Sequence, residues 1–266
     1  MVEGVHLRTS ASSGSVLDLF RLTGSVAVVT GAGSGLGAGF ARALAEAGAD
    51  VVVAARRRDR LEKVAESVTE LGRRCLVVPT DVTDPGQCDE LACAAVAEFG
   101  HLDVLVNNAG VTHTAPATRE RPEDYRNVLE VNLFGAYWMA QACARVMRPR
   151  SSIVNVASTL GLTKSVLPQA AYASSKAGLI GLTRDLSNQW SGRKGIRVNA
   201  IAPGFVETDM IEDMPSETLG RFIAESSLGR TATQREIDAA VVFLASSGAG
   251  YITGSTLAVD GGTSGH

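Results

Sequence analysis

A tyrosine and a lysine four residues apart, Tyr172 and Lys176, lie in a run of small, helix-tolerant residues at 170–178. Residues with this spacing fall on one face of a helix, about one turn apart. A free tyrosine has a pKa of about 10, but a nearby ammonium group favours the phenolate and lowers that pKa. The pair could therefore serve as a general acid or base. Because the same spacing often decorates a solvated helix face, this interpretation needs support from the rest of the chain.

A glycine-rich turn separates the first predicted strand, at 26–29, from the first predicted helix, at 40–47. The turn contains Gly31, Ser34, Gly35, Leu36 and Gly37. Glycines let the backbone approach a pyrophosphate closely, and the unpaired N–H groups at a helix start attract its charge. A purely structural turn is the alternative, but the position between a strand and a helix favours a phosphate-binding element.

Predicted strands and helices alternate along the rest of the chain. Further strands are expected at 51–54, 76–78, 104–106, 153–157, 197–201 and 256–259, and helices at 61–71, 85–99, 122–147, around Tyr172 and at 234–245. This alternation is typical of a single α/β domain with a doubly wound parallel sheet of the Rossmann type. Ligands of such sheets bind at the carboxyl ends of the strands. The polar or glycine residues predicted at such ends are Gly31, Asp81, Asn108, Ser158 and Gly204.

The composition is that of an ordinary globular protein. The chain has 266 residues, 45% hydrophobic and 20% charged, with a net charge of -3, which argues against a nucleic-acid or anionic-membrane partner. No apolar run approaches the roughly 18 residues of a membrane helix. The cysteines and histidines are scattered, so neither a disulfide framework nor a metal site is expected. The N-terminus has no apolar signal core, and the expected location is the cytoplasm.

Two segments are expected to stand apart from the sheet. Residues 1–22 are predicted to form a flexible N-terminal extension, because the stretch at 10–15 is rich in serine and glycine, and residues 23–266 form the domain itself. The segment 205–230 shows no strand pattern and is predicted to be a substrate-binding lid. Its apolar residues could line a pocket or pack a helix pair; they are Met210, Met214, Leu219, Phe222 and Ile223.

From about residue 23 to residue 262, the sequence resembles the short-chain dehydrogenase/reductase family. The motifs are Thr-Gly-x-x-x-Gly-x-Gly at 30–37, Asn-Asn-Ala-Gly at 107–110, Asn132, Ser158, Tyr-x-x-x-Lys at 172–176 and Pro-Gly at 203–204. The resemblance implies an enzyme that moves a hydride between a nicotinamide cofactor and a carbonyl or secondary alcohol. Two branches are similar to the chain: reductases of 3-oxoacyl thioesters, and sugar-acid or polyol dehydrogenases related to gluconate 5-dehydrogenase. Trp138 stands where the carrier-protein branch usually has a basic residue.

The resemblance implies roles for four residues. Tyr172 would exchange a proton with the substrate oxygen, and Ser158 would hydrogen-bond that oxygen. Lys176 would hold the nicotinamide ribose and lower the pKa of Tyr172, together with the charge of the oxidised nicotinamide. Asn132 would hold a water that links Lys176 to solvent. The structural alternatives are a strand-end cap for Ser158, a backbone bond for Asn132 and a solvated Lys176.

Cofactor choice is predicted from the residues after the second strand. An NAD enzyme places a carboxylate there, whereas here Ala55 is followed by Arg56 and Arg57. An arginine suits a phosphate, so NADP(H) is favoured over NAD(H), with a solvated basic helix start as the alternative. The other cofactor contacts that the resemblance implies are Asp81 and Val82 at the adenine, Asn108 and Gly110 on the adenosine side, Thr208 at the carboxamide, and Ala109, Pro203, Gly204 and Val206.

The expected partner is a small carbonyl or alcohol, contacted from 159–169, 205–230 and the loop at 111–114. His113 in that loop is a candidate pocket residue or ordinary loop surface. The resemblance also implies a homo-oligomer, either a dimer or a tetramer. The competing function is a dinucleotide-binding regulator without turnover. Such regulators commonly lack the catalytic tyrosine or lysine, and this chain keeps both.

Overall fold

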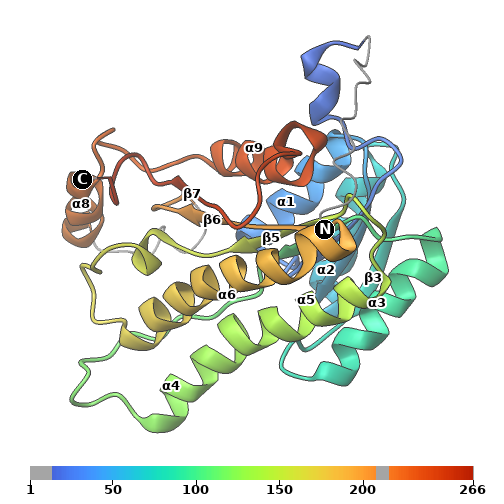
Figure 1. The fold of residues 1–266 in the computed structure, drawn as a ribbon. Coiled ribbons are helices and arrows are strands. Elements are labelled where there is room, and N and C mark those ends of the chain that lie inside the picture. Colours follow the sequence, from blue (N-terminus) through green and yellow to red (C-terminus); the bar gives the residue numbers. More distant parts are fainter. Residues whose placement is uncertain (1–13, 208–215, 266) are drawn as a thin grey trace, which may run out of the picture.

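A parallel sheet forms the centre of the molecule, for which the computed structural model describes residues 14–207 and 216–265 (Figure 1). The seven strands run in the order β3-β2-β1-β4-β5-β6-β7. Their bounds are β1 Val26–Thr30, β2 Asp50–Ala55, β3 Cys75–Pro79, β4 Val104–Asn107, β5 Ser152–Val156, β6 Arg197–Pro203 and β7 Thr256–Val259. Every neighbouring pair is parallel. The predicted fold class is therefore confirmed.

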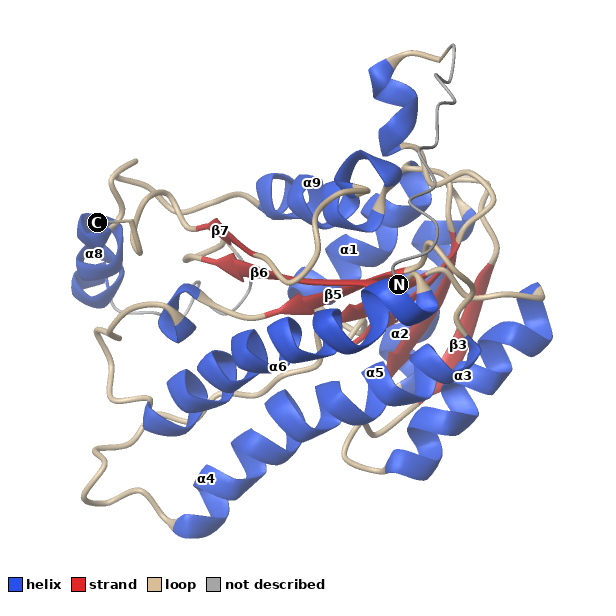
Figure 2. Cartoon of the chain, viewed as in Figure 1, coloured by secondary structure: helices blue, strands red, loops and turns tan. Residues whose placement is uncertain are grey.

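Helices cover both faces of this sheet. They are α1 Gly35–Glu46, α2 Arg58–Thr69, α3 Pro85–Phe99, α4 Pro122–Leu129, α5 Gly135–Val146, α6 Ala170–Lys194, α8 Ser216–Glu225 and α9 Gln234–Ala245, with short 3-10 turns at Val16–Phe20, Thr159–Gly161 and Ser247–Ala249. Helices α1, α2 and α9 pack on one face, and α3, α5 and α6 pack on the other. Figure 2 shows α1 and α9 on one side of the sheet and α5 and α6 on the opposite side. No described helix is long and apolar enough to span a membrane.

The apolar strands supply both halves of the core. In β1, Ala27 and Val29 join the core under α1, α2 and α9, whereas Val26 and Val28 join the core under α3, α5 and α6. Strand side chains point alternately to the two faces, so a strand covered on both sides must be apolar at every position. This requirement explains why the strands appear in the sequence as continuous apolar runs.

The helix predicted at 122–147 is interrupted near its middle. A π-helical turn, Glu130–Phe134, joins α4 to α5, and Gly135 N–H bonds the carbonyl of Glu130 across it. A π turn fits one extra residue into a helix and is frequent at functional sites. Hydrophobic periodicity cannot show such a local insertion, which here contains Asn132.

The two outlying segments are described only in part. Within 14–22, the Phe20 ring stacks on Phe243 of α9 at 5.9 Å between ring centroids, and Leu22 is buried. Residues 1–13, with most of the predicted extension, lie outside the described residues. Within the segment 205–230, α8 occupies 216–225, which agrees with the helix alternative for its apolar residues. Met210 and Met214 also lie outside the described residues.

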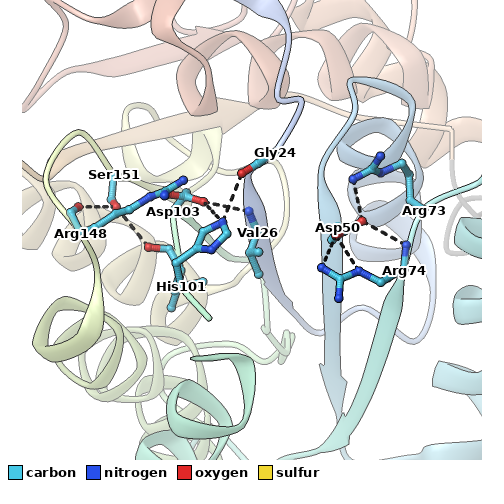
Figure 3. A network of polar contacts seen from close by, with 10 residues as sticks. Gly24, Val26, Asp50, Arg73, Arg74, His101, Asp103, Arg148 and Ser151 are labelled. Carbon is cyan, nitrogen blue, oxygen red and sulfur yellow. Dashed lines mark hydrogen bonds and ion pairs between the residues drawn. The ribbon is translucent and has the colours of Figure 1, made fainter. Parts of the chain in front are cut away.

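Two carboxylates lie at the amino edge of the sheet, where the strands begin (Figure 3). Asp50 opens β2 and accepts hydrogen bonds from the Arg73 side chain at 2.7 Å and from Arg74, whose main-chain N–H lies 3.1 Å away. Asp103 precedes β4 and is paired with Arg148. Burial alone would raise the pKa of Asp50, but the bonds and charges of Arg74 and Arg73 hold it below its usual value. These ion pairs brace the edge of the sheet that faces away from the candidate site.

Candidate active site

Helix α6 places Tyr172 and Lys176 one turn apart at the carboxyl edge of the sheet. It follows Gln169, whose carbonyl accepts the N–H of Ala173 at 2.9 Å. Because Tyr172 is in the first turn of α6, both side chains lie beside the loop that follows β5, and the Lys176 ammonium bonds the carbonyl of Val156, the last residue of β5. The predicted same-face geometry of the pair is therefore present.

Lys176 is a buried cation with unused hydrogen-bonding capacity. It is 4% exposed, and its Nζ donates to the Val156 carbonyl at 2.7 Å, which is its one hydrogen bond to the described residues. An ammonium group carries three donors, so two remain available. The same nitrogen lies 5.5 Å from the centroid of the Tyr172 ring. Burial lowers the pKa of Lys176 to about 8, so the side chain is still mostly charged at neutral pH. The solvated alternative for Lys176 is excluded.

The Tyr172 phenol does not behave as the sequence predicted. Burial raises the pKa of Tyr172 above its ordinary value, and a hydrogen bond with the Ser158 side chain opposes that rise only in part. The charge of Lys176 does not lower this pKa in the protein by itself. The partial burial of Tyr172 is not visible in the sequence, and desolvation disfavours the phenolate. The free protein therefore holds Tyr172 in its protonated form.

Ser158 sits at the carboxyl end of β5, next to Tyr172. It is 8% exposed, and its Oγ also accepts the N–H of Leu160 at 3.1 Å, which caps the 3-10 turn Thr159–Gly161. The structural alternative of a cap is therefore present, and Ser158 is also close enough to Tyr172 to lower the pKa of its phenol. The capping bond orients the hydroxyl group, and its proton stays free to point at another acceptor.

Asn132 lies in the π-helical turn and is 1% exposed. Its Oδ1 accepts the N–H of Val111 at 2.8 Å, and its Nδ2 donates to the Val111 carbonyl at 2.9 Å and to Ser175 Oγ at 3.1 Å. The amide thus ties the loop after β4 to α6. A Cβ added to Gly110 would lie 3.4 Å from Asn132 Oδ1 and 3.6 Å from Lys176 Nζ. Gly110 therefore keeps the space beside both groups open.

The glycine-rich turn is held to the end of β4. Gly31 has φ of +64°, and a Cβ there would meet the Cα of Ala109 at 2.8 Å, so only glycine fits without displacement. Asn108 donates its side-chain amide to the carbonyls of Thr30 at 3.0 Å and Gly31 at 3.2 Å. Asn108 is therefore a brace for the turn.

The start of α1 fits a pyrophosphate. Ser34 occupies the N-cap position but makes no capping side-chain bond, which leaves the first N–H groups of α1 without a side-chain acceptor. Gly35 has φ of +52°, and a Cβ placed on it would meet no atom within 4 Å, so this part of the turn borders open space. Free N–H groups at a helix start beside open space suit an anionic phosphate.

The region after β2 carries free positive charge. Arg56 and Arg57 are exposed, and no ion pair joins either side chain to a residue of the described ranges. Arg57 is the N-cap of α2 and provides no capping bond, so the start of this helix also lacks an acceptor. At the end of β3, Asp81 bonds the Thr83 hydroxyl at 2.8 Å, and Val82 is buried. This surface could hold a second phosphate group.

Residues of the segment 205–230 and of the loop after β7 line an additional cavity of about 220 Å³. The Phe205 and Phe222 rings form part of its wall and lie 3.5 Å apart between centroids. The wall also contains Ile223, Leu228, Val259 and Asp260. Of the other predicted residues in this area, Val206 bridges to Ala232, and Thr208 lies outside the described residues.

His113 contacts an aspartate of the neighbouring helix α4. Its Nε2 lies 3.7 Å from Asp124 Oδ2, and Asp124 is also bonded by Arg121 at 2.7 Å. Gln169, just before α6, donates to the hydroxyl of Thr112 at 2.9 Å, which joins this loop to the helix of Tyr172. The loop thus lies beside the site, with His113 turned to an acidic neighbour.

The roles of three polar residues that shape the site were not predicted from the sequence. Thr30 accepts the N–H groups of Asn108 and Ala109 at 3.1 Å each, and Ser175 bonds the carbonyl of Tyr172 at 2.7 Å. Both are buried hydroxyls, and both lie within the quoted motifs at 30–37 and 172–176. Asp260 follows β7 directly, so its place at a strand end was the available signal.

Comparisons with known proteins agree with this geometry. A family model described as enoyl-(acyl carrier protein) reductase matches residues 31–264. A 3-oxoacyl-[acyl-carrier-protein] reductase of Thermotoga maritima is 37% identical over 244 residues, which cover 91% of this chain and 98% of that protein. A cis-4-hydroxycyclohexanecarboxylate dehydrogenase of Sinomonas cyclohexanicum is 41% identical over 240 residues, covering 89% of this chain and 95% of that protein.

A solved structure of a short-chain type dehydrogenase/reductase from Mycobacterium marinum superposes with a TM-score of 0.90. It is 32% identical and covers 95% of this chain and 100% of that chain. The chain belongs to the short-chain dehydrogenase/reductase family, near its 3-oxoacyl reductases, and is an enzyme that acts on CH–OH or C=O groups with a nicotinamide cofactor.

Proposed function

We propose that the enzyme transfers a hydride between NADP(H) and a small carbonyl or secondary-alcohol substrate, with Tyr172 as the general acid or base. The observation that carries this proposal is the buried Lys176 ammonium, which uses one of its donors on the Val156 carbonyl. A buried cation with unused donors is costly unless a ligand completes its hydrogen bonds. The ribose hydroxyls of a nicotinamide nucleotide would be suitable acceptors.

In the reducing direction, negative charge develops on the substrate oxygen. Ser158 donates its hydroxyl proton to that oxygen in a hydrogen bond, and Tyr172 transfers its phenolic proton to it. The phenol of Tyr172 is protonated in the free protein, as proton donation in this direction requires. A bound nicotinamide supplies or accepts the hydride, and its oxidised form carries a positive charge. In the oxidising direction, Tyr172 accepts the proton instead.

Lys176 and Asn132 would return the proton to Tyr172. The Asn132 amide uses both donors of Nδ2 on Val111 and Ser175, so a water would bind through Oδ1 or the main-chain carbonyl. Such a water would lie between Lys176 and solvent and complete a proton relay. Replacing Asn132 with alanine would slow proton delivery and also loosen Val111.

NADP(H) is the proposed cofactor because of Arg56 and Arg57. Both are exposed after β2, and Ala55 leaves no carboxylate to bind a free ribose hydroxyl. An arginine can bind the 2′-phosphate with two parallel hydrogen bonds. Asp81, Val82, Asn108, Ala109, Pro203, Gly204, Val206 and Thr208 remain the proposed contacts along the rest of the dinucleotide.

A titration of the purified protein tests the cofactor. NADPH and NADH are added separately, and reduced-nicotinamide fluorescence reports binding. We expect tighter binding of NADPH, and Arg56→Ala should reduce NADPH affinity by about tenfold and leave NADH affinity unchanged. Arg58→Ala is the matched control, because Arg58 lies in the same basic run but is paired with Glu62 at 3.5 Å. Equal or tighter binding of NADH to the wild type would show that these arginines are only surface charge.

The proposed substrate is a small molecule with a secondary alcohol or carbonyl group. Relatives named as a 3-oxoacyl-[acyl-carrier-protein] reductase and as a cis-4-hydroxycyclohexanecarboxylate dehydrogenase support two classes, 3-oxoacyl thioesters and hydroxylated carboxylic acids. Trp138 favours the second class, because it packs on Tyr137 at 5.0 Å between ring centroids and replaces a basic residue expected for a carrier-protein partner. Rates with free and carrier-linked 3-oxoacyl substrates and with ring or sugar hydroxy acids would decide between them.

The enzyme is also proposed to assemble as a dimer or tetramer. Phe134 at the α4–α5 junction is 40% exposed, and Leu257 on the edge strand β7 is 37% exposed. Exposed apolar side chains on helix and edge-strand surfaces favour contacts between copies. Light scattering of the purified protein measures its mass directly, and a monomer at micromolar concentration would contradict this assembly.

A further inference from the structure

Asp260 is a buried carboxylate that the proposed chemistry does not use. It follows β7 at the carboxyl edge of the sheet and is 9% exposed. Its Oδ2 accepts the Thr159 hydroxyl at 3.1 Å and the Ser264 N–H at 2.9 Å, and its Oδ1 accepts the Gly262 N–H at 3.1 Å. A buried carboxylate with this many donors is strongly held in one position.

Thr159 is the residue directly after Ser158. It is 2% exposed, so its hydroxyl must find a partner inside the protein, and Asp260 supplies it. The Ser158 hydroxyl caps the same 3-10 turn that Thr159 begins. The bond to Asp260 therefore anchors the first residue of this turn, which is the residue bonded directly to Ser158.

The loop that carries Asp260 also contacts the proposed cofactor loop. Gly204 N–H bonds the Val259 carbonyl at 3.0 Å. A Cβ added to Gly204 would lie 2.8 Å from the Cα of Asp260, so the two backbones are in direct contact. A displacement of Asp260 would therefore also displace the segment at 203–206 and the turn after Ser158.

The same loop holds the end of the lid. Gly261 accepts at its carbonyl the N–H of Leu228 at 3.1 Å and the hydroxyl of Ser226 at 3.2 Å, and these residues follow α8 directly. Figure 1 shows α8 beside the C-terminal end of the chain. Asp260 and Gly261 also line the cavity between the lid and the C-terminal loop. The position of α8 is thus connected to Ser158 through two adjacent residues.

We infer that Asp260 is a positioning residue, which holds Ser158 in its reactive orientation through Thr159 and links that orientation to the seating of α8. This inference rests on the proposed role of Ser158. The simpler reading is that Asp260 only fastens the C-terminal loop. The two interpretations differ in what loss of the Thr159 hydroxyl changes. In the first it changes the orientation of Ser158, and in the second it changes only the loop at 260–264.

The test uses Thr159→Val and Thr159→Ser as a matched pair. Valine keeps the shape of threonine but removes the hydroxyl, whereas serine keeps the hydroxyl and removes the methyl group. We expect Thr159→Val to lower kcat by about tenfold, because a small misplacement of a reacting group is costly in rate, and to leave NADPH affinity within about twofold. Thr159→Ser should retain most of the wild-type kcat. Equal kcat values in the two folded variants would overturn the inference.

Hydrogen–deuterium exchange provides a second readout that needs no turnover. Thr159→Val should raise exchange both at 158–163 and at 226–231, and Thr159→Ser should not. Increased exchange at 260–265 alone would show that the bond serves only the C-terminal loop. If the wild-type enzyme turned over no carbonyl or alcohol, the proposed function would fail, and the exchange pattern would still decide the coupling.

Asp260→Ala tests the same link from the other side. Alanine removes both carboxylate oxygens, so the Thr159 hydroxyl loses its acceptor, as do the N–H groups of Gly262 and Ser264. We expect a drop in kcat at least as large as that of Thr159→Val, with no further loss when Thr159→Val is added to Asp260→Ala, because the bond that Thr159→Val removes is already absent. If the double variant lost kcat by the product of the two single-variant factors, the two residues would act independently, and the proposed link from Asp260 through Thr159 would be contradicted.

Discussion

Charged side chains at the amino and carboxyl ends of the strands differ in how completely they are paired. At the amino edge, Asp50 is surrounded by donors from Arg73 and Arg74, and Asp103 is paired with Arg148 (Figure 3). At the carboxyl edge, Lys176 is buried but bonds only the Val156 carbonyl within the described part of the chain. Full pairing stabilises a fold, whereas incomplete pairing leaves capacity for a ligand.

The directions of the pKa shifts express the same contrast. At the amino edge, the arginines overcome burial and hold the pKa of Asp50 below its usual value, so its charge is favoured. At the carboxyl edge, burial dominates: it lowers the pKa of Lys176 to about 8, and it raises that of Tyr172 although a hydrogen bond with Ser158 opposes the rise. The pKa of Lys176 is therefore moved toward physiological pH, that of Tyr172 is moved away from it so that the phenol stays protonated, and Asp50 stays charged.

Among these variants, Tyr172→Phe should cause the largest loss of turnover. The change removes the phenolic proton and little volume, so we expect turnover to fall by about 1000-fold while NADPH affinity stays within about twofold. Steady-state rates and fluorescence titration measure these two quantities. Turnover close to that of the wild type would remove Tyr172 from the mechanism.

The pH dependence of cofactor affinity should follow Lys176. Its pKa is lowered to about 8, so the charged form predominates below that pH and is lost as the pH rises through it. We expect NADPH affinity to fall by about tenfold per pH unit above about 8, provided that the ammonium makes the contact. Titrations across a pH series measure this change. An affinity that stayed constant to about pH 10 would show that Lys176 does not hold the cofactor.

Asp50→Asn should have the smallest effect on activity and a clear effect on stability. The variant keeps the shape of the side chain but weakens its bonds with Arg73 and Arg74, so we expect a loss of about 2 kcal/mol in the free energy of unfolding at neutral pH. Turnover of the folded enzyme should stay within about twofold, because Asp50 lies at the opposite edge from Tyr172. Denaturant unfolding and steady-state rates measure the two effects. A large drop in kcat would show that the edges are coupled.

The stability difference between Asp50→Asn and the wild type should also depend on pH with a definite sign. The folded pKa of Asp50 lies below its model value of 3.8, so its contribution is present above that pH and is lost as the pH falls through the folded pKa. The difference in unfolding free energy should therefore shrink below about pH 4. A difference that grew on acidification would contradict the ion-pair account.

The sequence predicted the sheet well because its strands are covered on both faces. Continuous apolar runs such as 26–29 and 51–54 mark buried parallel strands, and the observed β1 and β2 include them. The π-helical turn at Asn132 was missed, because one inserted residue barely changes hydrophobic periodicity. A helix at the position of α8 was left open as one of two alternatives, because Leu219, Phe222 and Ile223 have helical spacing but could also line a pocket.

The sequence predicted the residues of the candidate site that belong to motifs, but not their burial or their partners. Tyr172 and Lys176 were identified from residue type and spacing, and the roles of Ser158 and Asn132 from the family resemblance. The burial and the partners of these residues come from contacts distant in the sequence. Burial decides the direction of the Tyr172 pKa, and the Thr159–Asp260 bond joins residues 101 positions apart. No local pattern contains such information.

The central proposal is that the unused N–H donors of Lys176 bind a nicotinamide dinucleotide. The direct measurement is NADPH binding, followed by fluorescence, to the wild type, Lys176→Met and the control Lys194→Met. Lys194 lies at the far end of α6 and also donates to a main-chain carbonyl, that of Ala144 at 2.9 Å. We predict a loss of at least about tenfold in affinity for Lys176→Met and none for Lys194→Met. Equal NADPH affinity in all three proteins would contradict the account.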